Sequence, residues 1–296
     1  MTSAPAMDPD GGPVWSVRSG SRLVDGHLAW RRLAVGHRCE TWLAWSTERW
    51  APAVVKIARP HQVEHPRAQL ALSREAEALT NHPHPHLPLL LEDRRGQCPP
   101  HLITEYIDGP ALDELLEDTG DGLTTDEVAA LAAQLAGVLR WLHRRGLAHL
   151  DLTPANVLVR EGVPMLIDLG AALPLGRRQP RGAPIGSAGY AAPELEAGDP
   201  IAASMDLYGL GVTLYEALTG EPAFHPDCLP IHRPHPTTLT MPDGPLADLV
   251  RDLLDPDPGH RPPDTDAVLR ALPGPSASLM MWPRFATRHL RGVRRA

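Results

Sequence analysis

The chain has 296 residues and a formal net charge of −8, and aromatic residues make up 4% of it. This composition argues against nucleic acid as a partner, because nucleic-acid-binding surfaces are basic and often stack bases on aromatic rings. No apolar run reaches the roughly 18 residues of a membrane-spanning helix, and the first residues lack the charged and apolar regions of a secretory signal. We therefore expect a cytoplasmic protein. The three cysteines, Cys39, Cys98 and Cys228, form neither a metal-binding nor a disulfide pattern, which agrees with a reducing compartment.

The first third of the chain predicts a small antiparallel sheet and one helix. Residues 1–21 are rich in Pro, Gly, Ser and Asp, which is typical of a disordered arm. Short apolar stretches separated by turn signals then predict about five strands before residue 108. Apolar residues at three- and four-residue spacing predict a helix over residues 68–81. The candidate strands lie in the segments 23–35, 41–46, 51–58, 87–93 and 101–107.

Helical patterns dominate after Gly109. Residues 123–146 predict a long helix that begins with a capping box of Thr124 and Glu127 and ends in Arg and Gly. Residues 205–220 are nearly all apolar, so we expect a helix that is buried on all sides. Two amphipathic helices follow, over residues 245–255 and 265–272.

These elements predict an α+β fold of two lobes. The N-terminal lobe, an antiparallel sheet plus one helix, covers residues 22–108, and the helical C-terminal lobe covers residues 109–272. Residues 273–296 form a linker and a basic, partly apolar tail. Two interpretations of the tail remain: a helix that contacts a membrane surface or a partner, and a solvated terminus, which Pro283 and the short length favour.

Three histidines, His82, His84 and His86, alternate with prolines. A set of metal ligands is one interpretation, and a loop is the other. The prolines favour the loop, because no second cluster of ligand-type residues has matching spacing.

Lys56 is the single lysine among 28 lysines and arginines. It lies near the end of a β-branched run, and a strand there would fix its direction. Lysine is a compact point charge and arginine a wide fork, so this position favours a cation held between two close anions, unless the lysine persists by chance. Glu75 lies on the apolar face of the predicted helix beside Leu72 and Leu79, whereas Glu77 does not, so Glu75 is the expected partner.

Three oxygen-bearing side chains follow in the second half of the chain. Asp151 and Asn156 lie five residues apart in a loop that contains a proline, and Asp168 lies between an apolar strand and a glycine. Carboxylate and amide oxygens suit Mg²⁺, which prefers few protein ligands plus phosphates. A lysine, a divalent metal and a carboxylate beside an acceptor hydroxyl are the groups that phosphoryl transfer requires.

These motifs resemble those of the eukaryotic-type Ser/Thr protein kinases, including the bacterial ones, over roughly residues 22–272. The resemblance implies an enzyme that uses ATP and Mg²⁺, or Mn²⁺, to phosphorylate Ser or Thr of a protein substrate. It implies that Lys56 holds the α- and β-phosphates with Glu75 as its partner, that Asp151 orients the acceptor hydroxyl, and that Asn156 and Asp168 carry the metal. It also implies an Ala192-Pro193-Glu194 segment with Arg261 as the ion-pair partner of Glu194, a buried Asp206 that fixes the catalytic loop, and a gatekeeper and hinge at Thr104, Glu105, Tyr106 and Ile107 whose backbone meets adenine.

The sequence departs from this family at the loop expected to cover the nucleotide. Residues 33–41 keep only Gly36, while Ala34 and Cys39 replace glycines and Thr41 replaces the usual valine. We expect Ala34, Val35, Gly36 and Thr41 to contact the nucleotide, with side chains that loosen the backbone's approach to phosphate. Cys39 either lies over the nucleotide, where oxidation or alkylation would block it, or is a small residue of a strand turn.

Two further departures concern turnover and control. Thr153 replaces the lysine that contacts the γ-phosphate, which predicts slow transfer. Leu150 replaces the arginine that pairs with a phosphorylated activation loop, and residues 171–185 contain no Ser, Thr or Tyr. We therefore expect no control by activation-loop phosphorylation.

Two alternatives to a protein kinase remain at this point. One is a pseudokinase, a nucleotide-binding or empty scaffold for partner proteins, which the loop and Thr153 favour. The other is a small-molecule kinase of the aminoglycoside or choline type, which the Ala192-Pro193-Glu194 segment and Arg261 oppose.

Overall fold

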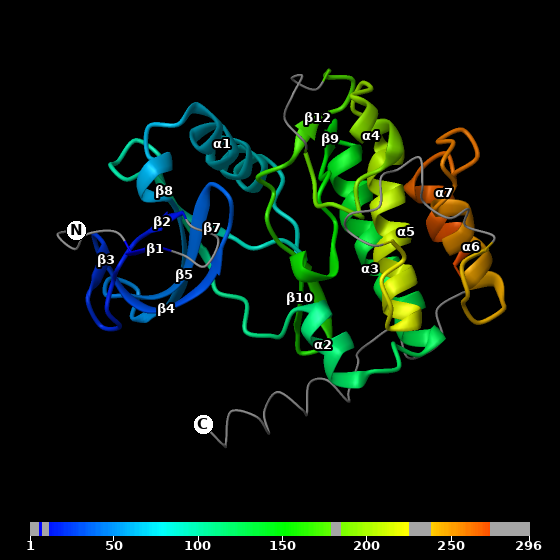
Figure 1. Cartoon of the computed structure of the whole chain (residues 1–296), viewed down its shortest axis with the longest axis horizontal. Coiled ribbons are helices and arrows are strands. Elements are labelled where there is room, and N and C mark those ends of the chain that lie inside the picture. The colour runs from blue at the N-terminus through cyan, green and yellow to red at the C-terminus, as the bar shows by residue number, and fades with distance from the viewer. Residues whose placement is uncertain (1–5, 8–11, 179–184, 225–237, 273–296) are drawn as a thin grey trace. The chain divides into compact units, whose positions relative to one another are not determined.

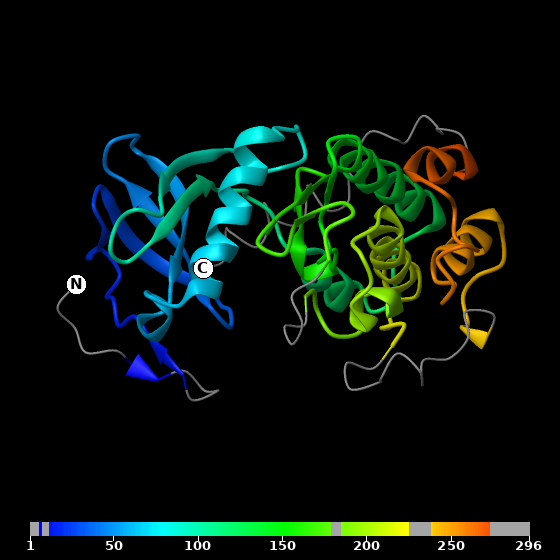
Figure 2. The same cartoon turned by 90° about the horizontal axis from the view of Figure 1, so that it is seen from above.

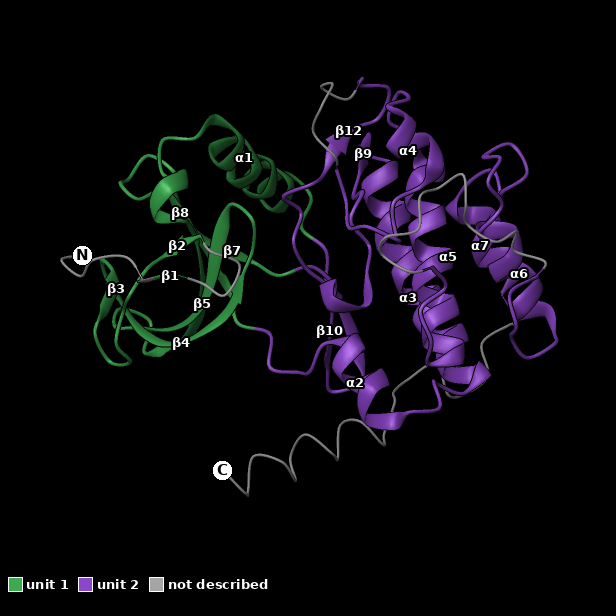
Figure 3. Cartoon of the chain, viewed as in Figure 1, with its two compact units in different colours: residues 1–83, 88–106 green, residues 84–87, 107–296 purple. Residues whose placement is uncertain are grey.

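A computed structural model describes residues 6–7, 12–178, 185–224 and 238–272. The chain divides into two compact units, shown in different colours in Figure 3. Unit 1 consists of residues 1–83 and 88–106, and unit 2 of residues 84–87 and 107–296. The predicted boundary at residue 108 therefore lies two residues beyond the end of unit 1, and the sequence did not reveal that the short stretch 84–87 belongs to unit 2.

Unit 1 is built on a six-stranded antiparallel sheet with the strand order β3-β4-β5-β6-β8-β7, covered by one long helix (Figure 1). The expectation of a sheet with a single α-helix is confirmed, and the 3-10 turn η1 is the further helical element. Its described elements are β1 (Ala6–Met7), β2 (Pro13–Val14), β3 (Arg22–Val24), β4 (His27–Val35), β5 (Cys39–Ser46), β6 (Ala51–Ala58), η1 (Pro60–Gln62), α1 (Pro66–Asn81), β7 (Leu90–Arg94) and β8 (His101–Glu105).

The helix and the sheet of unit 1 meet through small and branched apolar side chains. Leu72 and Ala76 of α1 are almost fully buried and pack with Ala58 of β6 and Leu102 of β8. A second apolar cluster of unit 1 contains Trp42 of β5 and buried residues of β3, β4, β6 and β8. This burial orients α1, because its polar residues are then left on the opposite side.

The N-terminal arm differs from the prediction. The described residues of this segment from Gly12 on do not behave as a disordered arm: Val14 is 1% exposed, and Trp15 packs against the core cluster that contains Trp42. The segment is rich in turn-forming residues, but the side chains of Val14 and Trp15 anchor it to the core. A composition averaged over residues 1–21 does not reveal the effect of two such side chains.

Unit 2 is helical, and its strands are short (Figure 2). Helix α5 packs against both α3 and α6, and almost every residue from Met205 to Leu218 is buried, as the apolar run predicts. The described elements are α2 (Leu112–Thr119), α3 (Thr125–His143), β9 (Leu147–Ala148), η2 (Pro154–Asn156), β10 (Val157–Arg160), β11 (Val163–Leu166), β12 (Leu173–Pro174), α4 (Pro193–Ala197), α5 (Ala203–Thr219), α6 (Pro245–Leu253) and α7 (Thr265–Ala271).

The start of α3 is formed as its sequence predicts. The Thr124 hydroxyl accepts from the backbone N–H of Glu127, whose carboxylate accepts from the backbone N–H of Thr124. This reciprocal pair satisfies two of the backbone donors that a helix start leaves without partners. Within the described parts of the chain, no helix combines the length and apolarity needed to cross a bilayer.

Candidate active site

Lys56 and Glu75 form an ion pair inside unit 1. Lys56 lies in β6 opposite Thr41 of β5 and Leu102 of β8, and its Nζ is 2.7 Å from Oε2 of Glu75 on α1. The side chains are 16% and 7% exposed, so the pair is largely shielded from solvent. Glu77, the alternative partner, is 67% exposed and instead pairs with Arg95 at 3.5 Å. The predicted choice of Glu75 is therefore confirmed as a contact.

The hairpin between β4 and β5, here named the phosphate-loop hairpin (residues 34–41), is held by two pairs of strand residues and one hydrogen bond across the turn. Ala34 pairs with Thr41 and Val35 with Glu40, and the N–H of Gly36 donates to the carbonyl of Cys39 at 2.9 Å. The side chains of Ala34 and Val35 are exposed. Cys39 instead packs into the core with Ala58 and Leu72, which favours its interpretation as a small residue of the strand turn.

Residues 149–156 of unit 2, which the family resemblance predicts to be the catalytic loop, form a connected polar network with Ser187. The Asn156 amide donates from Nδ2 to the carbonyl of Asp151 at 2.9 Å and to its Oδ2 at 3.1 Å. The Ser187 hydroxyl donates to Oδ1 of Asp151 at 2.7 Å. Both carboxylate oxygens of Asp151 thus have a donor, which fixes the plane of the carboxylate.

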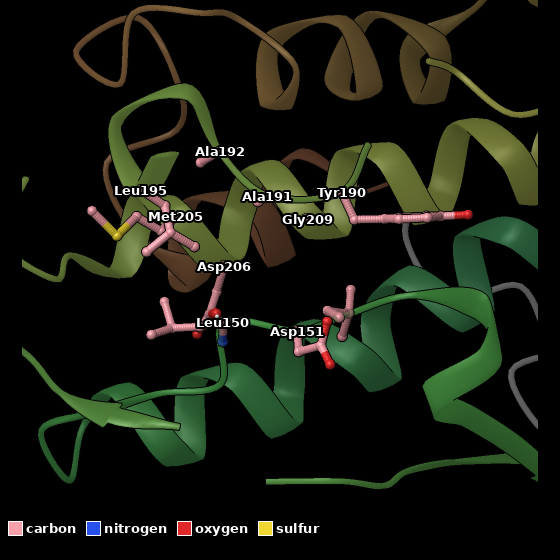
Figure 4. Close-up of a pocket in the computed structure, with 10 residues that line it drawn as sticks. Leu150, Asp151, Tyr190, Ala191, Ala192, Leu195, Met205, Asp206 and Gly209 are labelled. Atoms are coloured by element: carbon pink, nitrogen blue, oxygen red, sulfur yellow. Dashed lines mark hydrogen bonds between the residues drawn. The ribbon is translucent and has the colours of Figure 1, made fainter. Parts of the chain in front are cut away.

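Asp206 on α5 holds the backbone of this loop through hydrogen bonds (Figure 4). Its carboxylate accepts from the backbone N–H groups of His149 at 2.8 Å and Leu150 at 2.7 Å, and from Nε2 of His143 at 2.7 Å. Leu150 has a left-handed backbone (φ 67°) that a branched side chain rarely adopts, so these bonds compensate local strain. Burial alone would raise the pKa of the Asp206 carboxyl, but the hydrogen bond and charge of His143 outweigh burial and lower it.

Asp168 and Asn156 lie at the same end of the β10–β11 hairpin. Asn156 directly precedes β10, and the N–H of Ile167 donates to the carbonyl of Asn156 at 2.9 Å. Asp168 has a left-handed backbone (φ 61°), and its Oδ1 accepts from the N–H of Gly170 at 3.0 Å. Because the Asn156 amide nitrogen binds Asp151, its amide oxygen is directed elsewhere. One carboxylate and one amide oxygen at one hairpin end fit the small set of hard ligands that Mg²⁺ takes alongside phosphate.

The predicted ion pair of Glu194 and Arg261 is present and buried. Nη1 and Nη2 of Arg261 approach Oε1 and Oε2 of Glu194 at 2.6 and 2.9 Å, a bidentate geometry. The Arg261 side chain is 0% exposed, and Glu194 is the second residue of the short helix α4. This contact ties α4 to the segment before α7.

The sequence did not identify the contact between Tyr190 and Glu216. The Tyr190 hydroxyl donates to Glu216 on α5, and burial raises the pKa of both side chains. Glu216 is an acidic residue within a nearly all-apolar helix, and that was the available signal, because a buried carboxylate needs a donor. Tyr190 also borders a small cavity together with Asp151 and Asp206 (Figure 4).

The two residues predicted to contact adenine lie in different units. Glu105 ends β8 in unit 1, where its backbone N–H donates to the carbonyl of Leu89 at 2.9 Å. Ile107 begins unit 2 and is 3% exposed. Thr104 lies in β8 and is buried, as a gatekeeper side chain would be. Among the described residues, no cluster of three or more His, Cys, Asp and Glu residues is placed to bind a metal. The His84 ring instead lies tilted against the rings of His86 and Trp141, with centroid distances of 5.5 and 5.6 Å.

An antiparallel sheet with one helix, followed by a helical unit whose catalytic loop carries the Asp151 and Asn156 network, is the architecture of the protein kinase class. A crystal structure of the kinase domain of Mycobacterium tuberculosis PknI superposes with a TM-score of 0.64 at 23% identity, over 87% of this chain and 98% of that one, a likeness that shows the fold.

The chain belongs to the protein kinase domain family, which it matches over residues 32–270. Serine/threonine-protein kinase PknB of Mycobacterium tuberculosis is 29% identical over 216 residues, which cover 70% of this chain and 34% of that protein. Probable serine/threonine-protein kinase PkwA of Thermomonospora curvata is 31% identical over 238 residues, which cover 78% and 32%. These relatives support the eukaryotic-type bacterial Ser/Thr kinase family, and the chain spans about a third of their length.

Proposed function

We propose that this chain is an ATP- and Mg²⁺-dependent kinase that transfers the γ-phosphate to a Ser or Thr hydroxyl of a protein. The observation that carries the proposal is the coexistence of two complete polar networks. One is the shielded Lys56–Glu75 pair of unit 1, and the other is the Asp151–Asn156–Ser187 network of unit 2. Buried polar networks are costly when they are incomplete, and these two networks supply the cation, the carboxylate and the amide that phosphoryl transfer uses.

The side chains have separate tasks in this proposal. Lys56, held by Glu75 at 2.7 Å, presents its ammonium to the phosphates. Asp151 orients the acceptor hydroxyl and takes its proton, and Ser187 and Asn156 fix the carboxylate plane for that contact. Asn156 and Asp168 would hold Mg²⁺, which neutralises charge on the phosphates when bound. Ala34, Val35, Gly36 and Thr41 would line the phosphates, with the backbone of Glu105 and Ile107 at the adenine.

We propose that phosphorylation of the activation loop does not control this protein. Leu150 is 5% exposed and apolar where the family has an arginine, so it has no charge for a phosphate. The segment 171–185 carries no hydroxyl side chain, although its residues 179–184 lie outside the described part of the chain. Asp206 and Ser187 instead hold the catalytic loop through contacts that need no modification.

Slow turnover follows from Thr153. Its side chain is 4% exposed and carries no charge, so the loop contributes no cation to the transferring phosphoryl group. Loss of one preorganised electrostatic contact lowers rates by about 10²–10³ in other enzymes.

The test is Mg²⁺- and ATP-dependent phosphate transfer to the chain itself or to a generic basic protein, read by mass spectrometry. We expect transfer by the natural chain and none by Asp151→Asn or Lys56→Met. Glu75→Gln should lose most of the activity, whereas Glu77→Gln is a matched control on the same helix and should keep it. A natural chain that transfers no phosphate with either Mg²⁺ or Mn²⁺ would refute the enzyme.

A pseudokinase scaffold is the second candidate, and the side chains of Ala34 and Thr41 in the phosphate-loop hairpin favour it. Nucleotide binding without transfer would support it. Because Lys56 is the only lysine, an ATP-like acylating probe has two possible targets, its ammonium and the N-terminal amine. Labelling of Lys56 that ATP suppresses would place it in a nucleotide site, whereas unprotected labelling would exclude the kinase and a nucleotide-binding scaffold and leave only an empty scaffold. A small-molecule kinase is opposed by the buried Glu194–Arg261 pair.

The physiological setting belongs to the proposal as well. We place the chain in the cytoplasm, with a Ser- or Thr-containing protein as its substrate and no nucleic acid partner. The basic tail at 280–296, a candidate contact for a membrane surface or a partner, lies outside the described residues.

A further inference from the structure

Residues 12–15, here named the N-terminal strap, lie against the sheet of unit 1 beside the phosphate-loop hairpin. Trp15 makes three polar contacts there. Its backbone N–H donates to Oε1 of Glu40 at 2.8 Å, its indole N–H donates to the carbonyl of Ala58 at 2.9 Å, and its carbonyl accepts from Arg32. These contacts span three strands and hold the strap in one register.

The buried carboxylate of Glu40 favours binding of the strap, because it accepts a hydrogen bond from Trp15. Its carboxylate is 0% exposed, lies inside the hairpin next to Cys39, and also accepts from the indole N–H of Trp42 at 3.1 Å. Arg32 pairs with it at 3.1 Å. A buried carboxylate is costly unless donors surround it, and Trp15 supplies one of those donors. Burial raises the pKa of Glu40, which agrees with a carboxylate that depends on its partners.

Arg59 connects the strap to the tip of the hairpin. Its guanidinium donates from Nε to the carbonyl of Pro13 and from Nη1 to the carbonyl of Gly36, each at 3.2 Å. Its backbone N–H donates to the carbonyl of Arg38 at 3.0 Å. The side chain is 6% exposed, and Gly12 lies directly on it, because a Cβ at Gly12 would be 2.2 Å from Nη2.

The bond to Gly36 fixes a whole peptide plane. A trans peptide is planar, so its C=O and the following N–H point in opposite directions. With the Gly36 carbonyl held by Arg59, the N–H of His37 is directed away from Arg59. Backbone N–H groups with a fixed direction are what a phosphate-binding loop requires. A hairpin with a single glycine can gain this order from Arg59 in place of the usual glycine-rich sequence.

We infer that Arg59 and the N-terminal strap position the phosphate-loop hairpin for binding the phosphates of the nucleotide. Arg59 contacts no substrate in this arrangement and is a positioning residue. The inference rests on the proposed nucleotide site at Lys56 and adds to it the device that orients the backbone above that site.

Two substitutions break the device in different ways. Arg59→Met removes the guanidinium and replaces the unbranched aliphatic part of the side chain. Gly12→Ala keeps Arg59 in the sequence, but the added methyl group would lie 2.2 Å from its Nη2 and should displace the guanidinium from the N-terminal strap. Each has a matched control: Arg31→Met removes an exposed arginine of β4, and Gly96→Ala adds a methyl group where no atom lies within 4 Å.

The experiment measures dissociation constants of adenosine, ADP and ATP by calorimetry on the full chain, with thermal stability of every variant. We expect Arg59→Met and Gly12→Ala to weaken ADP and ATP about ten-fold, which corresponds to about 1.4 kcal/mol, and adenosine less than about two-fold. The controls should match the natural chain. Amide hydrogen exchange of residues 34–41 without nucleotide should accelerate in both strap variants.

The outcomes separate this inference from the proposed function. Equal weakening of all three ligands would mean a general loss of structure and would overturn the positioning role. Unchanged ADP and ATP binding in both strap variants would overturn it as well, while leaving the proposed function intact. A natural chain that binds none of the three ligands would overturn the proposed nucleotide site, and with it the phosphate role of the strap. Unchanged amide hydrogen exchange of residues 34–41 in both strap variants would by itself refute the claim that Arg59 and the strap order the phosphate-loop hairpin.

Discussion

Replacing Arg261 with methionine tests how the end of the activation segment is held. The Arg261 guanidinium is fully buried and forms two bonds to Glu194. It also donates to three backbone carbonyls: Asp255 at 2.7 Å, Ser204 at 2.9 Å and Pro256 at 3.3 Å. Methionine fills a similar volume but satisfies none of these acceptors, so a nearly buried carboxylate is left without its counter-charge.

The expected cost follows from this contact set. Removing one partner of a buried ion pair costs about 3–5 kcal/mol, because the remaining charge stays buried. This is a large share of the roughly 5–15 kcal/mol that stabilises a folded domain. Glu194→Gln should cost less, about 1.5–3 kcal/mol, because in this variant Arg261 keeps its three carbonyl acceptors. In Arg261→Met, by contrast, the Glu194 carboxylate would keep only the Ser204 hydroxyl at 3.4 Å.

The assay is equilibrium urea unfolding of the natural chain, both single variants and the double variant. The double variant should be more stable than the sum of the single effects predicts, because removing both charges leaves neither buried alone. Arg251→Met is the control, since Arg251 pairs with an Asp248 that is 72% exposed, and its cost should be about 0–1 kcal/mol. If Arg261→Met cost less than Glu194→Gln, the argument from the carbonyl acceptors would be refuted.

Three further predictions concern the catalytic loop. Thr153→Lys should raise the rate of phosphate transfer by up to about 10²-fold in single-turnover kinetics, and no gain would contradict the account of slow turnover. Ser187→Ala should lower kcat about ten-fold with unchanged thermal stability, because one hydrogen bond to Asp151 is lost; an equal loss of stability would indicate a structural role instead. Asp206→Asn should cost about 1.5–3 kcal/mol at neutral pH in urea unfolding. The folded pKa of Asp206 lies below its ordinary value of 3.8, so its stabilisation is complete above that pH and is lost as the pH falls through the lower folded value. The difference between Asp206→Asn and the natural chain should therefore narrow in acid, and a difference independent of pH would refute the role of the carboxylate.

Much of the fold was predictable because local rules dominate it. Strand alternation and turn residues placed the sheet of unit 1, and the capping box of Thr124 and Glu127 placed the start of α3. The apolar face of α1 selected Glu75 over Glu77, since helix periodicity determines which side chains point at the sheet.

The N-terminal strap was not predictable from local patterns. Trp15 and Glu40 are 25 residues apart, and Arg59 and Pro13 are 46 apart. No periodicity links such positions, and the composition of residues 1–21 indicated a disordered arm. The same holds for Tyr190 and Glu216, whose contact depends on how α5 packs beneath the segment before α4.

The sequence by itself determined the candidate site of this protein: one lysine, a carboxylate partner for it, and an Asp–Asn–Asp set in the order that resembles the protein kinase motifs. Residue types and spacings suffice for that, because they specify charge, ligand atoms and the face of a helix. Only the tertiary structure decided which groups hold these residues in place. Examples are Asp206, which accepts from the N–H of Leu150, and Arg59, which donates to the carbonyl of Gly36. Those contacts join distant segments through burial and hydrogen bonding, which depend on the packed chain as a whole.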